Sequence, residues 1–301
     1  MQKKDATVQS SVTLSPAETP KHSRILLTVA FGIIGIICAL AIVLAIKMPA
    51  RKAAKQDLFN ALKNNDSRVV TKILDQYPDL VNEDYYAILV PIDASNSSPL
   101  IHAIKYGDLE MVNLLVEKGA NVNKSTARSY PLHQALFLGK YDVAWYLINN
   151  GANVLAKSGK WKESVPFCIL SQRITQDNAD WEQAQYELMK YVLEHGAPLD
   201  PPSGSLEGIK TLLGLAVYQN NKLIAKYLLD KQICNVNEIV NPEYTKKTAL
   251  IIATEKQSYE LCQLLLNYGA DITATDIDGN AAIDYAKALD NEQLLALLKN
   301  K

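Results

Sequence analysis

Apolar positions recur along residues 53–301 as pairs of short helical stripes. The second stripe of a pair has apolar residues at i, i+3 and i+4, as in Val112, Leu115 and Val116. This spacing predicts an amphipathic helix with one buried face. The pairs open at residues 98, 130, 165, 211, 248 and 280, at intervals of 32 to 46 residues. Such a period predicts a stack of helical pairs rather than one globular core.

Polar residues and glycines mark where each expected helix begins and ends. Ser98 precedes Pro99, and a Ser or Thr at this position caps free N–H groups while Pro loses no hydrogen bond there. Gly119 follows the second stripe, where a glycine adopts the left-handed conformation without a Cβ penalty. These signals predict a helix, a turn, a second helix and a connecting loop in each copy.

The copies resemble the ankyrin repeat, whose signature is Thr-Pro-Leu-His-x-Ala, then helices, then Gly-Ala-Asp-Val-Asn. The second copy opens with Tyr130-Pro131-Leu132-His133-Gln134-Ala135 and closes with Gly151-Ala152-Asn153-Val154. Residues 269–283 read like the family's junction between two repeats. The resemblance covers about residues 53–301 and implies an all-α ankyrin-repeat solenoid.

We expect repeats near residues 97–125, 129–157, 164–200, 210–238 and 247–274, between caps at 53–84 and 279–300. The third copy has about ten extra residues around Arg173 to Trp181. This insertion either lengthens a helix or forms a loop, and the resemblance does not decide between them.

A second pattern lies near the N-terminus. The 22 residues 25–46 contain no charge and are bracketed by Arg24 and Lys47. As a helix they would span about 33 Å, enough for the hydrocarbon layer. The pattern predicts one transmembrane helix, preceded by a disordered tail (1–24) and followed by a basic linker (47–52). A cleaved signal, the alternative, has a shorter apolar core. Gly35 and Ala39 would fit self-association of this span, although chance produces the same spacing.

The orientation of this span depends on its flanking cations. Those within fifteen residues are Lys21 and Arg24 before it and Lys47, Arg51, Lys52 and Lys55 after it. This bias favours a cytoplasmic repeat domain. Lys3 and Lys4 equalise the count over the whole tail, so the opposite orientation stays open.

Charge and cysteine content limit the classes of partner. Residues 53–301 hold 24 Lys and Arg against 30 Asp and Glu, a net charge of −6, which disfavours nucleic acid as the partner. Cys38 lies in the apolar span, and Cys168, Cys234 and Cys262 show no CxxC spacing. Structural thiols are therefore expected in the repeats.

Residues for catalysis or metal binding are sparse. His133 occupies the signature position, where the resemblance implies that it ties neighbouring turns together by hydrogen bonds. His102 and His195 have no carboxylate or cysteine at metal-ligand spacing. No phosphate-binding loop or nucleophile elbow occurs. We therefore expect no enzymatic activity, no cofactor and no metal.

The expected site is a binding surface made by the first helices and the connecting loops between repeats. We call these loops the fingers. In the ankyrin repeat, fingers and first helices together form the concave face of the stack. Aromatic and Arg side chains usually anchor protein interfaces. The candidates are Arg128, Tyr130, Phe137, Lys160, Trp161 and Tyr218. Trp161, in a hydrophilic turn, is the main one, with packing onto the next repeat as the alternative. Trp145 and Trp181 fall in apolar stripes and are expected in the core.

The sequence therefore predicts a membrane-tethered module that binds an unknown protein. One alternative is an immunity-type protein that neutralises a toxic enzyme. A less favoured one is an enzyme that uses the insertion in the third copy.

Overall fold

The computed structural model describes residues 33, 36, 48–84, 97–126, 129–158, 162–171, 179–200 and 208–300. The chain divides into two compact units, residues 1–53 and 54–301. The predicted tail and, apart from Ile33 and Ile36, the predicted span at 25–46 lie outside the described residues. Within the described part, no helix combines the length and apolarity needed to cross a membrane. Of the predicted linker, residues 48–52 are helical.

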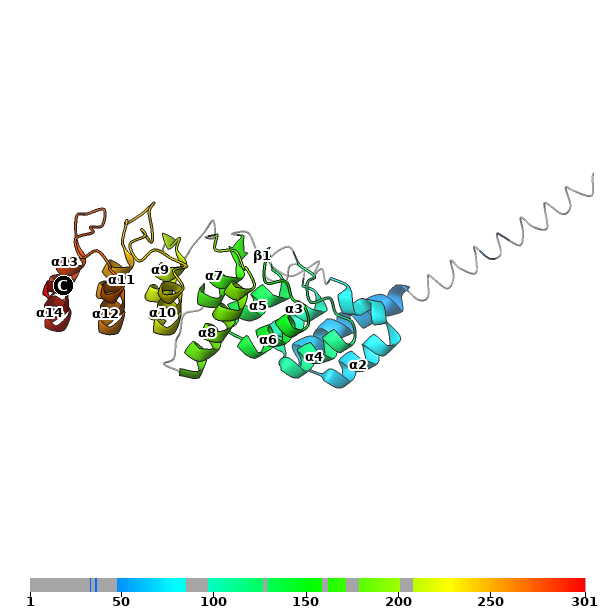
Figure 1. Ribbon diagram of the computed structural model, residues 1–301. Coiled ribbons are helices and arrows are strands. Elements are labelled where there is room, and N and C mark those ends of the chain that lie inside the picture. The colour runs from blue at the N-terminus through cyan, green and yellow to red at the C-terminus, as the bar shows by residue number, and fades with distance from the viewer. Residues whose placement is uncertain are drawn as a thin grey trace, which may run out of the picture. The chain divides into compact units, whose positions relative to one another are not determined.

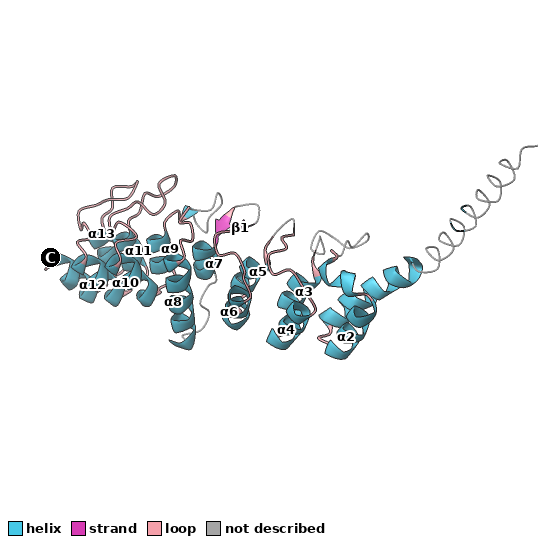
Figure 2. Ribbon diagram, turned by 45° about the vertical axis from the view of Figure 1, so that its right-hand side comes forward, coloured by secondary structure: helices cyan, strands magenta, loops and turns pink. Residues whose placement is uncertain are grey.

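The second unit is a row of helical pairs (Figures 1 and 2). After helical residues 54–63, its elements are α2 (Ser67–Gln76), η1 (Pro78–Asn82), α3 (Pro99–Tyr106), α4 (Leu109–Glu117), α5 (Pro131–Phe137), α6 (Tyr141–Asn149), β1 (Lys157–Ser158), β2 (Glu163–Ser164), α7 (Val165–Ser171), α8 (Ala179–Glu194), α9 (Leu212–Tyr218), α10 (Lys222–Asp230), α11 (Ala249–Glu255), α12 (Tyr259–Asn267), α13 (Ala282–Ala288) and α14 (Glu292–Lys299). The strands β1 and β2 form a short antiparallel hairpin. The predicted all-α solenoid is confirmed.

Local side chains cap several helices as the sequence predicted, although α5, α6 and α12 begin without a side-chain cap. Ser98 Oγ accepts a hydrogen bond from the N–H of Ile101 at 3.2 Å, and Thr211 and Thr248 cap α9 and α11 in the same way. The second helices use acidic or amide caps: Asp66, Asp108, Asn221 and Asn291 begin α2, α4, α10 and α14. Each such cap typically contributes about 1 kcal/mol.

Left-handed residues end the second helices. Gly119, Gly151 and Gly269 have φ values of 90°, 85° and 81°, a region that favours glycine. In the fourth repeat Gln232 occupies this place with a φ of 52°. The fourth copy thus keeps the left-handed turn although its closing sequence has Gln232 in place of the glycine.

The core lies between neighbouring helical pairs, and it is continuous from Leu58 to Leu298. Along most of the row the first helices (α3, α5, α7, α9, α11 and α13) contact one another more extensively than the second helices do. Closer packing on one side bends a stack toward that side. The first helices therefore line its concave side.

The third repeat differs from its neighbours. Its second helix, α8, has 16 residues where α6 and α10 each have 9, so the insertion lengthens this helix. Residues 172–178, which precede α8, lie outside the described residues. Trp181, near the start of α8, packs edge-to-face against Tyr141 of α6 with ring centroids 5.2 Å apart. Trp145 and Trp181 are both partly buried against the core, in agreement with the prediction.

A buried amide on α8 joins three repeats. Gln185 Nε2 donates to the hydroxyl of Tyr141 at 2.8 Å and to the carbonyl of Ile169 at 3.0 Å. Its Oε1 accepts from Asn221 Nδ2 at 2.8 Å. Gln185 is 1% exposed, and a buried polar group of this kind is stable only when its partners are present. Repeats two, three and four therefore share one hydrogen-bond network.

Candidate functional site: the fingers and first helices

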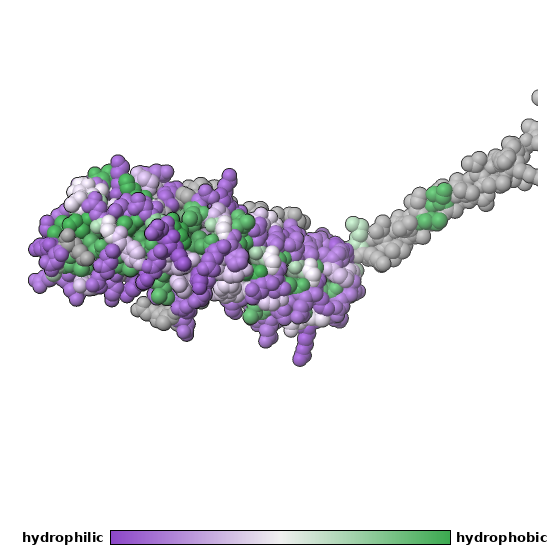
Figure 3. Space-filling model, in the orientation of Figure 1, coloured by the Kyte–Doolittle hydropathy of each residue, from purple (hydrophilic) through white to green (hydrophobic). Residues whose placement is uncertain are grey.

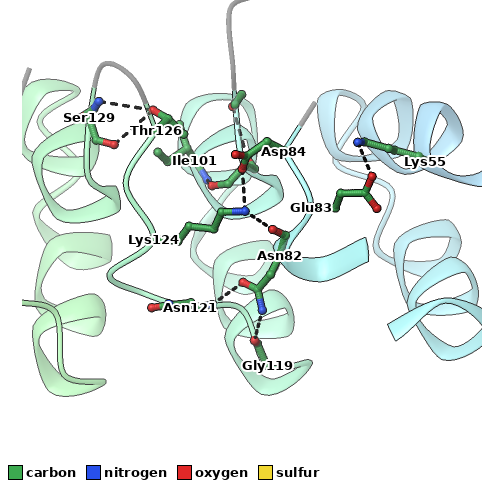
Figure 4. A network of polar contacts seen from close by, with 12 residues as sticks. Lys55, Asn82, Glu83, Asp84, Ile101, Gly119, Asn121, Lys124, Thr126 and Ser129 are labelled. Carbon is green, nitrogen blue, oxygen red and sulfur yellow. Dashed lines mark hydrogen bonds and ion pairs between the residues drawn. The ribbon is translucent and has the colours of Figure 1, made fainter. Parts of the chain in front are cut away.

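An asparagine at the base of one finger holds the next finger in place (Figure 4). Asn82 Nδ2 donates to the carbonyl of Gly119, and the N–H of Asn121 donates to Asn82 Oδ1, both at 2.8 Å. The first and second repeats are joined in the same way by Asn123, and the fourth and fifth by Asn237. We call this pair of hydrogen bonds the amide clamp.

The amide clamp cannot form between the second and third repeats. Leu155 stands where Asn123 and Asn237 stand in other copies, and Pro198, which has no N–H, stands where Asn121 stands. Both halves of the clamp are thus absent from the sequence at this junction. Lys157 instead forms an ion pair with Asp200 at 2.5 Å, and both side chains are largely exposed. Exposed pairs of this kind contribute little, so the Gln185 network carries more of the coupling here.

Figure 4 also shows how the first finger is attached to the N-terminal cap. Lys124 donates to the carbonyl of Asn82, and its Nζ lies 2.8 Å from a carboxylate oxygen of Asp84. Lys55 forms a 2.7 Å ion pair with Glu83. Thr126 and Ser129 hydrogen-bond to each other across the tip of the finger. These contacts hold the described part of this finger against the neighbouring cap.

The second finger rests on the start of α5. The N–H of Tyr130 donates to Ser158 Oγ at 3.1 Å. His133 Nε2 lies 3.2 Å from the carbonyl oxygen of Glu163, which confirms that His133 ties the turns together. Burial lowers the pKa of His133 to about 4, so its ring is neutral at pH 7. This finger is positioned by a neutral, buried histidine.

The structure describes three of the six candidate binding residues. Arg128, Lys160 and Trp161 lie outside the described residues. Tyr130 is half-buried, with its ring 5.8 Å from that of His133. Phe137 ends α5 and is 56% exposed. Tyr218 ends α9, and Lys256 Nζ lies 3.9 Å from the centre of its ring.

The first helices also end in exposed apolar residues that are not among the predicted binding residues. Tyr106, which ends α3, and Leu138, which follows Phe137, are 43% and 37% exposed. The N–H₃⁺ of Lys140 donates to the carbonyl of Gly107 at 2.7 Å, which holds the ends of α3 and α5 together. We call Tyr106, Phe137 and Leu138 the anchor row. Tyr106 and Leu138 occupy the same position in the first and second copies. The fourth and fifth copies have Gln219 and Lys256 at this position, so aligning the copies distinguishes the two apolar residues.

Further exposed apolar residues lie on the fingers of the C-terminal repeats. Ile239, Tyr244 and Ile277 are 45%, 61% and 57% exposed. The N–H of Ile277 donates to the carbonyl of Thr245 at 2.9 Å, so these two fingers are hydrogen-bonded to each other. The surface drawn in Figure 3 is mostly hydrophilic, with apolar patches between polar residues. Such patches are typical of protein-binding surfaces.

Nucleophilic and metal-binding groups are not assembled in the described part of the chain. Burial raises the pKa of the Cys234 thiol to about 12 and that of Cys262 to about 11, which keeps both in the unreactive thiol form. The pKa of Cys168 is also raised by burial. Among the described residues no group of three His, Cys, Asp or Glu side chains could hold a metal ion.

Comparison with known proteins decides the family. The family described as ankyrin repeats (3 copies) matches residues 58–158 and 181–276, about two thirds of the chain. The chain belongs to the ankyrin-repeat family. The break between the two matched segments coincides with the third repeat, where α8 is lengthened. As an ankyrin-repeat chain, it is a protein–protein interaction module.

Curated relatives match part of the chain. The chain is 36% identical over 109 residues to ankyrin repeat and SAM domain-containing protein 6 of Rattus norvegicus, covering 35% of this chain and 11% of the relative. It is 30% identical over 190 residues to the probable palmitoyltransferase AKR2 of Saccharomyces uvarum. This match covers 62% of this chain and 24% of the relative. The chain therefore spans a quarter or less of these relatives.

Two solved structures have the same fold. The human ASB11 ankyrin repeat domain is 22% identical, with a TM-score of 0.56, covering 80% of this chain and 96% of the other. A chain from the complex of the predatory endopeptidase Bd0816 of Bdellovibrio bacteriovorus with immunity protein Bd3460 is 25% identical. Its TM-score is 0.54, and the match covers 68% of this chain and 98% of that one.

Proposed function

We propose that this chain is a membrane-tethered ankyrin module that binds a protein partner through its fingers and first helices. The observation that carries the proposal is the anchor row. Phe137, at the end of the first helix α5, is 56% exposed, and Tyr106 and Leu138 at the ends of α3 and α5 are also exposed. An exposed aromatic side chain supplies a large apolar contact area and loses little rotamer freedom on binding.

The supporting scaffold is rigid where it carries these side chains. Lys140 fixes the ends of α3 and α5, and His133 fixes the finger above α5. Binding is strengthened when interface groups are ordered beforehand, because less conformational entropy is lost. The anchor row is therefore suited to contact an apolar area of a partner.

Tethering by residues 25–46 is the second part of the proposal. It is supported by the absence of charge over a length that suits a bilayer. The flanking cations favour repeats on the cytoplasmic side. A reporter fused after Lys301 tests the orientation, since a reporter active only outside the cytoplasm would reverse it.

Partner capture tests the binding surface. The full-length chain is used as bait with Phe137→Ser, Trp161→Ala or Leu223→Ser. Leu223 is the matched control, because it is an exposed apolar residue (38%) on a second helix. The proposal expects Phe137→Ser to weaken capture of the specific partner at least about tenfold, the loss of one interface anchor. Equal retention by all three variants, or no specific partner, would refute it.

An immunity-type function is a second candidate. It is favoured by the likeness to a chain from the complex of an endopeptidase with an immunity protein. In that case the captured partner is an enzyme whose activity falls in proportion to added chain. A captured partner without hydrolytic activity would exclude this role and leave the scaffold role. In either role the chain itself performs no catalysis.

A further inference from the structure

A cluster of aromatic rings lies on α6 and at the C-terminal end of α8, the second helices of the second and third repeats. Trp145 of α6 meets Tyr191 of α8 edge-to-face, with ring centroids 5.2 Å apart. His195 stacks on Tyr191 with centroids 3.9 Å apart and an interplanar angle of 21°. The stack is fixed because His195 Nδ1 hydrogen-bonds to the carbonyl of Tyr191 at 2.7 Å. We call Trp145, Tyr191 and His195 the aromatic cluster.

The cluster is accessible rather than enclosed. Trp145 and Tyr191 are partly exposed and His195 is exposed. His195 directly follows α8, which ends at Glu194, and it stacks on Tyr191 at the C-terminal end of that helix. Among the described residues no cation lies over the ring of Trp145, Tyr191 or His195. This contrasts with Tyr218 on the concave side, which is already covered by Lys256.

Carboxylates lie within four residues of the cluster's rings on the same two helices. Asp142 lies three residues before Trp145 on α6, and Glu187 and Glu194 flank Tyr191 on α8, all three exposed. Lys190 is the cation on the same part of α8, and it is partly buried. Neighbouring helices add to the negative charge, since Glu117 of α4 raises the pKa of the Tyr146 hydroxyl together with burial. Lys118 of α4 is already paired with Asp75 at 2.6 Å.

We propose that the aromatic cluster and its carboxylates bind a basic, arginine-containing segment of a protein. A guanidinium group stacks on aromatic faces and forms paired hydrogen bonds with carboxylates, and it loses less hydration than an ammonium group does. The cluster supplies both elements together. Its negative surroundings repel nucleic acid and anionic lipid, so the occupant is a cationic protein segment. This surface lies on the second helices and is separate from the anchor row.

Defined peptides test this inference with the full-length chain. Three short fluorescein-labelled peptides of the same length carry Arg, Lys or Glu at alternate positions, separated by Gly and Ser. Binding is followed by fluorescence anisotropy at about 50 mM and about 200 mM salt, across which an electrostatic contact weakens. The inference expects the Arg peptide to bind most tightly, the Lys peptide about threefold more weakly and the Glu peptide not at all.

Surface variants locate the binding. His195→Ala and Glu194→Gln each change an exposed side chain and should weaken the Arg peptide about three- to fivefold, as expected for one cation–ring or charge contact. Glu194→Gln should also reduce the salt dependence. The matched control is Glu260→Gln on α12, which changes an exposed carboxylate on the same row of second helices and should leave binding unchanged.

The inference is overturned if the wild-type chain does not bind the Arg peptide, if Arg and Lys peptides bind equally, or if all variants bind as the wild type does. Far-UV circular dichroism verifies that each variant is folded. None of these results bears on capture through the anchor row, so the two proposals fail separately.

Discussion

Replacing Gln185 by Leu tests how the lengthened repeat is held in the stack. The side chain is 1% exposed, so Leu fills a similar volume but makes none of its hydrogen bonds. The Tyr141 hydroxyl, the Ile169 carbonyl and the Asn221 amide each lose a partner at 2.8–3.0 Å. A buried group left without a partner costs about 1–3 kcal/mol. Because Leu adds favourable apolar burial, we expect a loss of about 3–4 kcal/mol in the free energy of unfolding.

Urea unfolding of the full-length chain measures this loss. Far-UV circular dichroism follows all helices, and tryptophan fluorescence follows Trp145, Trp161 and Trp181, of which Trp181 contacts Tyr141. Because neighbouring repeats unfold together only when their interfaces are strong, the variant should also show a broader or divided transition. The matched control is Gln183→Leu on the same helix, which is exposed and bonds only to Glu187 within the described residues. It should change stability by less than about 0.5 kcal/mol.

A double-mutant cycle makes the test sharper. Tyr141→Phe removes the hydroxyl that Gln185→Leu leaves unsatisfied, so the two changes together should cost about 1 kcal/mol less than the sum of the single changes. A loss below about 1 kcal/mol for Gln185→Leu, or additive behaviour in the cycle, would refute this reasoning.

Three more predictions follow from the described residues. Since burial lowers the pKa of His133 from 6.5 to about 4, the unfolded chain binds more protons between these values, and this histidine should lower stability by up to about 3 kcal/mol as pH drops from 6.5 to 4. Burial also lowers the pKa of His102 to about 4, so His133→Gln should reduce, without abolishing, the pH dependence of urea midpoints across that range. Leu155→Asn with Pro198→Asn should restore the amide clamp and raise the free energy of unfolding by about 1 kcal/mol, whereas Leu155→Asn alone should gain less. Cys168, Cys234 and Cys262 should react with Ellman's reagent at pH 8 only after urea unfolding, because burial raises each thiol pKa. Rapid labelling of any of these three in the folded chain with Cys38 replaced by Ser would contradict this.

The fold could be predicted from the sequence because its determinants are local. Ser98, Thr211 and Thr248 cap helices within three residues of themselves, and Gly119 ends a helix by its own conformation. Most copies repeat these signals, so a copy in which one signal is missing can still be assigned by alignment with the others. The repeat architecture follows from such short-range physics.

The coupling between repeats is harder to read from the sequence. Gln185 lies 44 residues from Tyr141 and 36 from Asn221, and nothing in its local pattern distinguishes it from the exposed Gln183. The Lys256 contact with Tyr218 likewise depends on side-chain conformations in different repeats. The missing amide clamp is an exception, because Leu155 and Pro198 occupy recognisable positions in the repeat.

The candidate site was predictable in part. The sequence predicts Phe137 as a binding residue because an aromatic residue at this first-helix position is not needed for packing, and Phe137 is exposed. The exposure of Tyr106 and Leu138 does not follow from the sequence, because each stands one position further along its helix, where exposure depends on how the helix ends. Arg128, Lys160 and Trp161 remain predictions.

The central claim is that the partner binds the concave side, and a hydrogen-exchange footprint of the captured partner on the full-length chain tests it most directly. We expect backbone amides in the fingers and first helices, above all at residues 131–139, to exchange more slowly in the complex than in the free chain. Amides of the second helices should exchange equally in both. Protection confined to α6, α8 and α10, with residues 131–139 exchanging as in the free chain, would contradict it.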